Sequence, residues 1–138
     1  MLPAVQTPIR SYRDLRIYQA AFALQQEIFK TTRTFPPEER YSLTDQIRRS
    51  SRSIGANLAE AWTKRRFSAH FLSKLTDVDG EANETWHWLE TACACGYLDD
   101  NQVSQLLAQL ESICRMLGRM MQEADAFVPP RAGKAATS

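Results

Sequence analysis

The chain has 138 residues, of which 43% are hydrophobic and 24% are charged, as in an ordinary single globular domain. It has no apolar run of membrane-spanning or secretory-signal type, so we expect a soluble cytoplasmic protein without membrane contact. The cysteines lack the spacing of a disulfide framework or a metal site, so we expect reduced thiols. They are Cys93, Cys95 and Cys114.

The net charge of +1 hides an uneven distribution of charge along the chain. Residues 1–70 carry 12 Lys and Arg against 6 Asp and Glu (+6), whereas residues 71–138 carry 5 against 10 (−5). The two halves can neutralise each other within a bundle or between subunits, which is the interpretation we favour. The alternative is a basic surface that contacts nucleic acid.

Apolar residues recur at helical spacing from the start of the chain. The first predicted helix spans residues 12–33, with Ser11 as its N-cap and Asp14 three residues later. It carries two adjacent apolar lines, which together make a wider face than one helix contact needs. One line is Leu15, Tyr18, Phe22 and Phe29, and the other is Ile17, Ala21, Leu24 and Ile28.

The second predicted helix spans residues 42–64 and follows a turn that contains Pro36, which disfavours helical geometry in the residue before it. Small residues on this helix permit close approach of another backbone. They are Ser50, Ser51, Gly55 and Ala56.

Two further helices follow. Ser68 is the predicted N-cap of the third helix, which ends at Gly96, a residue suited to the left-handed position after a helix. Asp99 and Gln102 predict a capping box at the start of the fourth.

The fold class is therefore all-α, an up-down-up-down antiparallel four-helix bundle. It covers residues 12–127, between an N-terminal extension (residues 1–11) and a disordered C-terminal tail (residues 128–138).

A line of polar residues follows the second helix beside its apolar stripe. At about 100° per residue, the line lies within roughly 80° of the helix circumference. Its side chains are mostly short hydrogen-bonding groups, unlike a solvated face. We predict a structural polar network that fixes the register of the helices. Its predicted members are Gln46, Arg49, Ser53, Asn57, Glu60 and, from the third helix, Glu84.

Basic residues also gather on the second helix. Guanidinium groups bind phosphates in a bidentate manner, so these residues predict contacts with an RNA or DNA backbone. They are Arg48, Arg52, Lys64, Arg65 and Arg66. The alternative is a solvated face whose last cations interact with the negative end of the helix dipole. We expect no aromatic residues among the cations of the kind that stack on bases.

Enzymatic signals are weak. Asp77, Glu81 and Glu84 share a face of the third helix and could bind a divalent metal or act as acid and base, but pairing with arginines is the favoured interpretation. His70 and His87 lack zinc-site spacing. No Gly-rich phosphate loop or nucleophile motif is present. We therefore expect no enzyme, no metal and no cofactor.

Three segments resemble one protein family: YRDLRIYQAA, FPPEERYSLTDQIRRSSRSIGANLAEA and GEANETWHWLETACACGYL. The family is that of the four-helix-bundle proteins encoded in intervening sequences of bacterial 23S ribosomal RNA genes. It includes the related accessory variability protein of diversity-generating retroelements. The resemblance covers about residues 12–125. The matching positions are Gln46, Arg49, Ser53, Ile54, Asn57, Ala59, Glu60, Gly80, Glu84, Leu89, Ala92, Gly96 and Tyr97.

One departure from the family pattern is Ala61, where relatives often have Gly, followed here by WTKRR. The resemblance implies a non-enzymatic bundle that forms a homo-oligomer, typically a ring of five. In the retroelement relatives it also implies a basic surface that contacts nucleic acid and a partner reverse transcriptase.

We therefore predict a non-enzymatic, oligomeric structural or adaptor protein, a homopentamer by the resemblance, with a further protein as a candidate partner. The alternative is an accessory module that binds RNA or DNA through the second helix.

Overall fold

The computed structural model describes residues 8–129, and within that range it contains helices and no strand. The four long helices are α1 (Arg16–Thr32), α2 (Leu43–Thr63), α3 (Ser68–Ala94) and α4 (Asp100–Gln122). Three short 3₁₀ helices accompany them: η1 (Tyr12–Asp14), η2 (Pro37–Glu39) and η3 (Ala124–Phe127). The predicted all-α four-helix bundle is confirmed. The predicted tail lies outside the described residues except for Val128 and Pro129.

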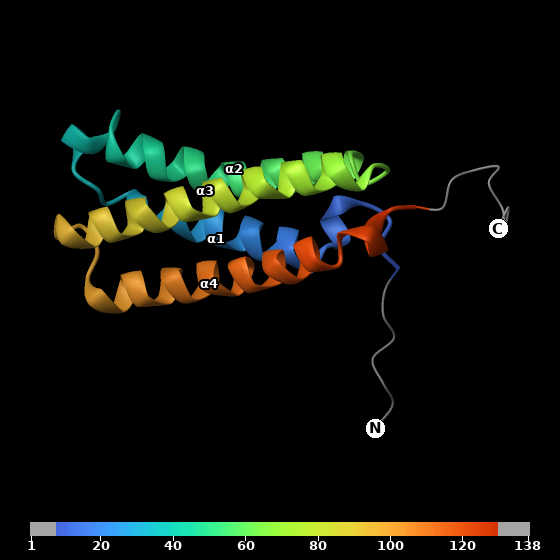
Figure 1. The fold of residues 1–138 in the computed structure, drawn as a ribbon. Coiled ribbons are helices and arrows are strands. Elements are labelled where there is room, and N and C mark those ends of the chain that lie inside the picture. Colours follow the sequence, from blue (N-terminus) through green and yellow to red (C-terminus); the bar gives the residue numbers. More distant parts are fainter. Residues whose placement is uncertain (1–7, 130–138) are drawn as a thin grey trace, which may run out of the picture.

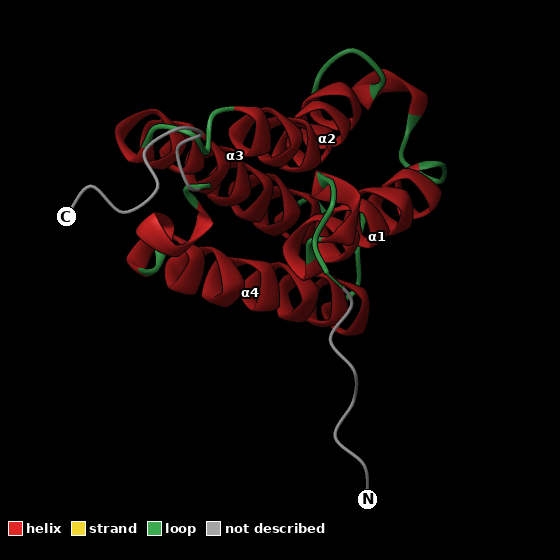
Figure 2. Ribbon diagram, turned by 90° about the vertical axis from the view of Figure 1, so that its right-hand side faces the viewer, coloured by secondary structure: helices red, strands yellow, loops and turns green. Residues whose placement is uncertain are grey.

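The helices are arranged as a square in which α1 and α3 lie on one diagonal (Figure 2). The connections α1–α2 and α3–α4 lie at one end of the bundle, and the α2–α3 turn lies at the other (Figure 1). Each helix directs a line of apolar residues inward, for example Leu24, Ile54, Leu75 and Leu110, which are fully buried. Each such side chain contributes roughly 2 kcal/mol of hydrophobic free energy.

The start of α1 differs from the sequence prediction. Ser11 and Asp14 do form a capping box, but it caps the start of the short helix η1 and not of α1. The Asp14 carboxylate accepts hydrogen bonds from the backbone N–H groups of Arg10 (2.8 Å) and Ser11 (3.1 Å). Leu15 then takes an extended conformation, which directs its side chain into the core (4% exposed), and α1 begins one residue later.

The termini of α3 and α4 mostly follow the prediction. Ser68 is already helical and does not cap α3, because Phe67 occupies the N-cap position in an extended conformation. Gly96 has the predicted positive φ of 80°, and the next residue, Tyr97, donates its N–H to the carbonyl of Ala92 (2.9 Å). The capping box at the start of α4 is confirmed.

Two glycines give a matched test of this backbone geometry. Gly96→Ala should destabilise the protein by about 1 kcal/mol, because a Cβ is strained at positive φ. Gly118→Ala should stabilise it by up to about 1 kcal/mol, because Gly118 is inside α4 and a Cβ there meets no atom within 4 Å. Urea denaturation of both variants measures the two changes, and equal signs would contradict the assignment.

Candidate functional site

The most extensive helix–helix contact in the bundle joins α2 and α3. At its centre, the hydroxyl of Thr85 donates a hydrogen bond to the hydroxyl of Ser50 (2.9 Å) and both residues are fully buried. Ala82, which is also fully buried, lies one turn before Thr85. The small side chains allow the close approach that the sequence predicts for Ser50. Of the predicted small residues, Ser51 and Gly55 are also buried, whereas Ala56 is exposed.

Beside this contact lies a group of polar side chains that we call the Arg49 cluster. The Arg49 guanidinium donates to the Glu84 carboxylate and lies 3.5 Å from Glu81 Oε2. Arg49 Nε also donates to Gln46 Oε1 (3.3 Å), and Trp88 Nε1 donates to Glu84 Oε1 (3.3 Å). The cluster thus links α2 to α3 through one cation and two carboxylates.

The pKa values of the two carboxylates in the cluster are shifted in opposite directions. The hydrogen bond from Arg49 lowers the pKa of Glu84. Burial raises the pKa of Glu81, and this effect exceeds the attraction of Arg49. Glu81 Oε2 is buried, and its ion pair with Arg49 is too long for a hydrogen bond, so the oxygen has no hydrogen-bond partner. Charge is therefore well accommodated on Glu84 and poorly on Glu81.

The other predicted members of the polar network are not brought into the Arg49 cluster. Ser53 and Asn57 bond to the carbonyls of Arg49 (2.9 Å) and Ser53 (2.8 Å), as short polar side chains in helices often do. Glu60 lies about 16 Å along α2 from Arg49 and contacts Lys74 Nζ instead (2.9 Å).

The predicted nucleic-acid residues divide into two groups, one on α2 and one at the turn that follows it. Arg48 in the first group and Lys64 in the second are about 24 Å apart along the helix axis. In the first group, Arg48 and Arg52 lie against α1. Arg48 Nε donates to Thr32 Oγ1 (2.8 Å), and the guanidinium carbons of Arg48 and Arg52 lie 4.8 Å and 5.6 Å from the centre of the Phe29 ring. Contact with α1 therefore sets the orientation of both arginines.

A residue that sequence reasoning missed joins this group. Arg33 lies 5.0 Å from the centre of the same Phe29 ring. Burial and the charges of Arg52 and Arg33 lower the pKa of Arg48. Three guanidinium groups therefore surround one aromatic ring, and none of them has a carboxylate of the described residues within 4.0 Å.

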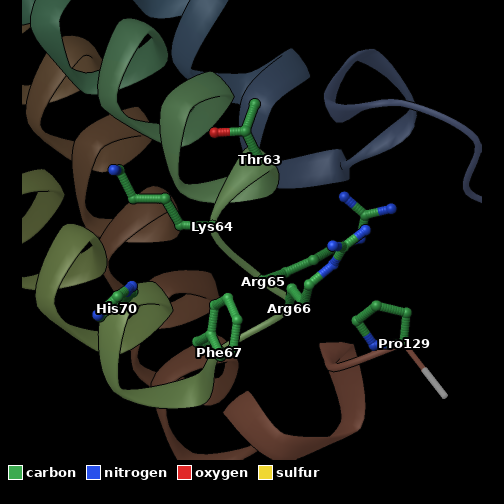
Figure 3. Close-up of a pocket in the computed structure, with 7 residues that line it drawn as sticks. All are labelled: Thr63, Lys64, Arg65, Arg66, Phe67, His70 and Pro129. Carbon is green, nitrogen blue, oxygen red and sulfur yellow. The ribbon is translucent and has the colours of Figure 1, made fainter. Parts of the chain in front are cut away.

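The second group lies at the turn between α2 and α3, in a pocket of about 350 Å³ (Figure 3). The side chains of Arg65 and Arg66 extend toward Pro129, and Lys64 extends to the opposite side. Phe67 lies among them, is 52% exposed, and its ring centre is 5.6 Å from that of His70. One aromatic ring therefore lies beside these cations, which the sequence analysis did not single out, and the adjacent letters KRRF were the available signal.

Arg65 is the least free of the three cations at this turn. Its guanidinium carbon lies 3.9 Å from the centre of the Trp62 ring, and its Nη1 donates to the Trp62 carbonyl (2.7 Å). Lys64 and Arg66 are exposed. We therefore regard these two, with Phe67, as the accessible part of the turn.

Other candidate chemistry finds little geometric support. Within residues 8–129, no three His, Cys, Asp or Glu side chains come together as metal ligands. Asp77 lies 3.5 Å from Lys74 Nζ, so the predicted acidic line divides between two cationic partners. The three cysteines are free thiols. None of the described helices has both the length and the apolar character needed to cross a membrane.

Comparison with known proteins places this arrangement in a family. The sequence pattern of the 23S rRNA-intervening sequence protein family matches residues 13–119, which include the Arg49 cluster and both basic groups of α2. The chain belongs to this family.

A solved structure supports the same placement. It is a protein of unknown function from the S23 ribosomal protein family of Bacteroides thetaiotaomicron. The two sequences are 27% identical, and the TM-score of 0.68 applies to 77% of this chain and 98% of that chain. No curated protein matches the chain at a significant level. Membership therefore establishes a family and a fold, and neither description names an enzymatic activity.

The Arg49 cluster predicts opposite effects for two conservative substitutions. Glu84→Gln should destabilise the protein at pH 7 by about 1 kcal/mol, because it weakens the charged hydrogen bond to Arg49. Glu81→Gln should be neutral or stabilising at pH 7, because it removes a carboxylate whose ionisation the fold disfavours.

The pH dependence follows from the direction of each shift. The depressed pKa of Glu84 stabilises the fold above the unfolded pKa near 4.5, and this contribution is lost as the pH falls through the folded pKa. The raised pKa of Glu81 has the opposite sign, so its contribution is lost as the pH rises through its folded pKa. Chemical denaturation at pH 7 and pH 4 measures both, and a destabilising Glu81→Gln at pH 7 would contradict the burial argument.

Proposed function

We propose that the protein is a non-catalytic helical subunit that assembles with copies of itself into a closed ring and acts as a structural or adaptor protein. The observation that carries this proposal is the apolar surface along the outer side of α1 and α2. We call it the α1–α2 surface. It comprises Tyr12, Tyr18, Phe22 and Ala56. Phe29 borders it, beneath the guanidinium groups of Arg33, Arg48 and Arg52.

The bundle buries only one of the two apolar lines of α1 completely. Tyr18 and Phe29 are half-buried, and Phe22 remains 47% exposed. The rings of Tyr12 and Tyr18 are 4.8 Å apart, and those of Tyr18 and Phe22 are 6.3 Å apart, so the aromatic surface is continuous. A Cβ on Gly55 would lie 3.4 Å from the Tyr18 ring, which shows how closely α2 supports this line. Exposed aromatic surface of this kind is typical of protein interfaces.

The distribution of charge favours a second copy of the chain as the occupant of this surface. Inside one subunit, Arg49 and Lys74 are the only cations of the described residues that form ion pairs between α2 and α3. In the described part of the chain, Arg13 and Arg52 beside the α1–α2 surface form no ion pair within 4.0 Å. The exposed residues Glu90 and Asp100 on α3 and α4 form none either.

The square arrangement places the α1–α2 edge opposite the α3–α4 edge. A basic edge on one side and an acidic edge on the other favour a head-to-tail contact between copies. Such heterologous contacts form rings when the rotation closes, and the family resemblance implies a ring of five. In this arrangement the two halves of the chain neutralise each other partly within one bundle and partly between subunits, both of which the favoured interpretation of the sequence includes.

The proposal predicts that Phe22→Ser disrupts assembly. Light scattering should give a mass of several chains for the unchanged protein and a lower mass for the variant, with α-helical content retained because Phe22 is 47% exposed. Phe67→Ser is the matched control, since Phe67 is 52% exposed but lies outside the α1–α2 surface. A monomeric unchanged protein, or an equal effect of both variants, would reject the proposal.

A second candidate function, nucleic-acid binding, is supported by the turn between α2 and α3. Lys64 and Arg66 can contact phosphates there, and the exposed ring of Phe67 can stack on a base. Stacking on an accessible ring requires an unpaired base, so single-stranded RNA or DNA is the favoured ligand.

Binding to a labelled single-stranded oligonucleotide tests this candidate. Phe67→Ser should weaken binding by roughly 1–3 kcal/mol, the range for one base stacked on an aromatic ring, while Phe22→Ser should not affect it directly. The logarithm of affinity should fall with the logarithm of salt concentration, by ~0.7 for each phosphate contacted. No binding at low salt, or equal binding by Phe67→Ser, would reject the assignment.

A further inference from the structure

We infer that the corner where α1 meets α2 is a binding site for phosphate groups, built by Arg33, Arg40 and Arg48. The hollow shares Phe29 with the border of the proposed assembly surface, and it lies at the opposite end of α2 from the Phe67 turn. None of the predicted functions assigns a role to Arg33 or Arg40.

The corner contains a hollow of about 360 Å³, within the size range of small-ligand sites. The three arginines line it together with the side chain of Thr44. The segment Pro36–Pro37 and the ring of Phe35 complete its wall, and Phe35 is buried. The wall is therefore stiff, because proline fixes the backbone and the aromatic ring is anchored in the core.

The positive charge around this hollow has no counter-charge. In the described residues, Arg33, Arg40 and Arg48 have no carboxylate within 4.0 Å. Glu39, which precedes Arg40 in the sequence, accepts hydrogen bonds from Ser42 (2.7 Å) and from the hydroxyl of Tyr97 (2.8 Å). Its charge is thereby held on the Tyr97 side of the turn and raises the pKa of Tyr97 to about 12.

The central arginine is already held in position. Arg48 uses only Nε for its bond to Thr32, whose own hydroxyl donates to the carbonyl of Ile28 (2.7 Å). The face of the guanidinium rests on Phe29. The two terminal amino groups form no hydrogen bond with any described residue, so they can donate to a ligand without losing an existing contact. A donor that is already held in position loses less conformational entropy when a ligand binds.

These features favour a phosphate group over a carboxylate. Arginines bind phosphates in a bidentate manner, and a phosphate offers oxygens in several directions to donors from different elements. Here the donors come from the end of α1, the turn that follows it and the start of α2. Phosphate also carries up to two negative charges near neutral pH, which suits several uncompensated cations.

Isothermal titration with pyrophosphate tests the site. Arg33→Gln and Arg40→Gln should each weaken binding about tenfold, as expected for the loss of one charged hydrogen-bonding partner. Both side chains are exposed, so the fold should be retained. Arg119→Gln on α4 is the matched control, because Arg119 is also exposed, the charge change is identical and the position is outside this hollow.

The outcomes separate the site from general electrostatic attraction. Undetectable pyrophosphate binding, an equal loss in Arg119→Gln, or equally tight binding of citrate would overturn the proposal. The source of the phosphate follows from competition in the Phe67→Ser background. There, an oligonucleotide that displaces pyrophosphate identifies a nucleic-acid backbone, whereas displacement by a nucleoside monophosphate alone identifies a small phosphorylated molecule. Either result supports the site and leaves the assembly proposal to be tested separately.

Discussion

The close contact between α2 and α3 is the constraint on which the rest of the structure depends. The hydroxyls of Ser50 and Thr85 are fully buried and bond to each other. Each hydroxyl also lies within hydrogen-bonding distance of a carbonyl of its own helix, that of Ile47 for Ser50 (3.4 Å) and that of Glu81 for Thr85 (2.8 Å). Sliding one helix along the other would therefore cost the bond between the helices, about 1 kcal/mol, together with the packing of the small side chains around it. The register is thereby fixed, and it places Arg49 opposite Glu81 and Glu84. It also turns the remaining side of α2 toward α1, so the position of every basic group on that side follows from the same contact.

The cations on the two sides of α2 have different partners. On the α3 side, Arg49 is compensated by carboxylates, and its pKa is raised, first by the hydrogen bond to Glu84. On the α1 side, Arg48 and Arg52 rest on Phe29, an uncharged ring. A cation–π contact holds a guanidinium in place without neutralising it. The charge on this side therefore remains available to a ligand, whereas the charge on the α3 side serves the register of the bundle. Positive charge on α2 therefore has two different environments, one with carboxylates and one without.

Sequence periodicity predicted the helices well because each helix buries a face with a period of about 3.6 residues. Gly96 and the Asp99–Gln102 box were predictable because the signals for a helix end or start are local. The sequence also placed Arg49 and Glu84 in one polar network, since both belong to the face where α2 meets α3. The orientation of Arg48 was not, because periodicity gives the side of a helix but not which neighbour covers it. Arg33 and Arg40 were missed for the same reason: they approach Arg48 only when α1 and α2 pack. Phe67 was visible in KRRF, but its exposure depends on the extended N-cap of α3.

Assembly and phosphate binding would reinforce each other through multiplicity. A closed ring repeats each surface once per subunit, so every arginine corner and every Phe67 turn would recur by symmetry. A single hollow with three arginines, open to solvent, should bind one phosphate only modestly. A polyanion that reaches several corners of one ring gains effective concentration with each further contact, and its affinity rises by orders of magnitude without any new type of contact. A small phosphorylated molecule gains nothing from this repetition. Loss of the ring should therefore weaken binding of a long polyanion far more than binding of pyrophosphate, which makes the oligomeric state the determinant of ligand class.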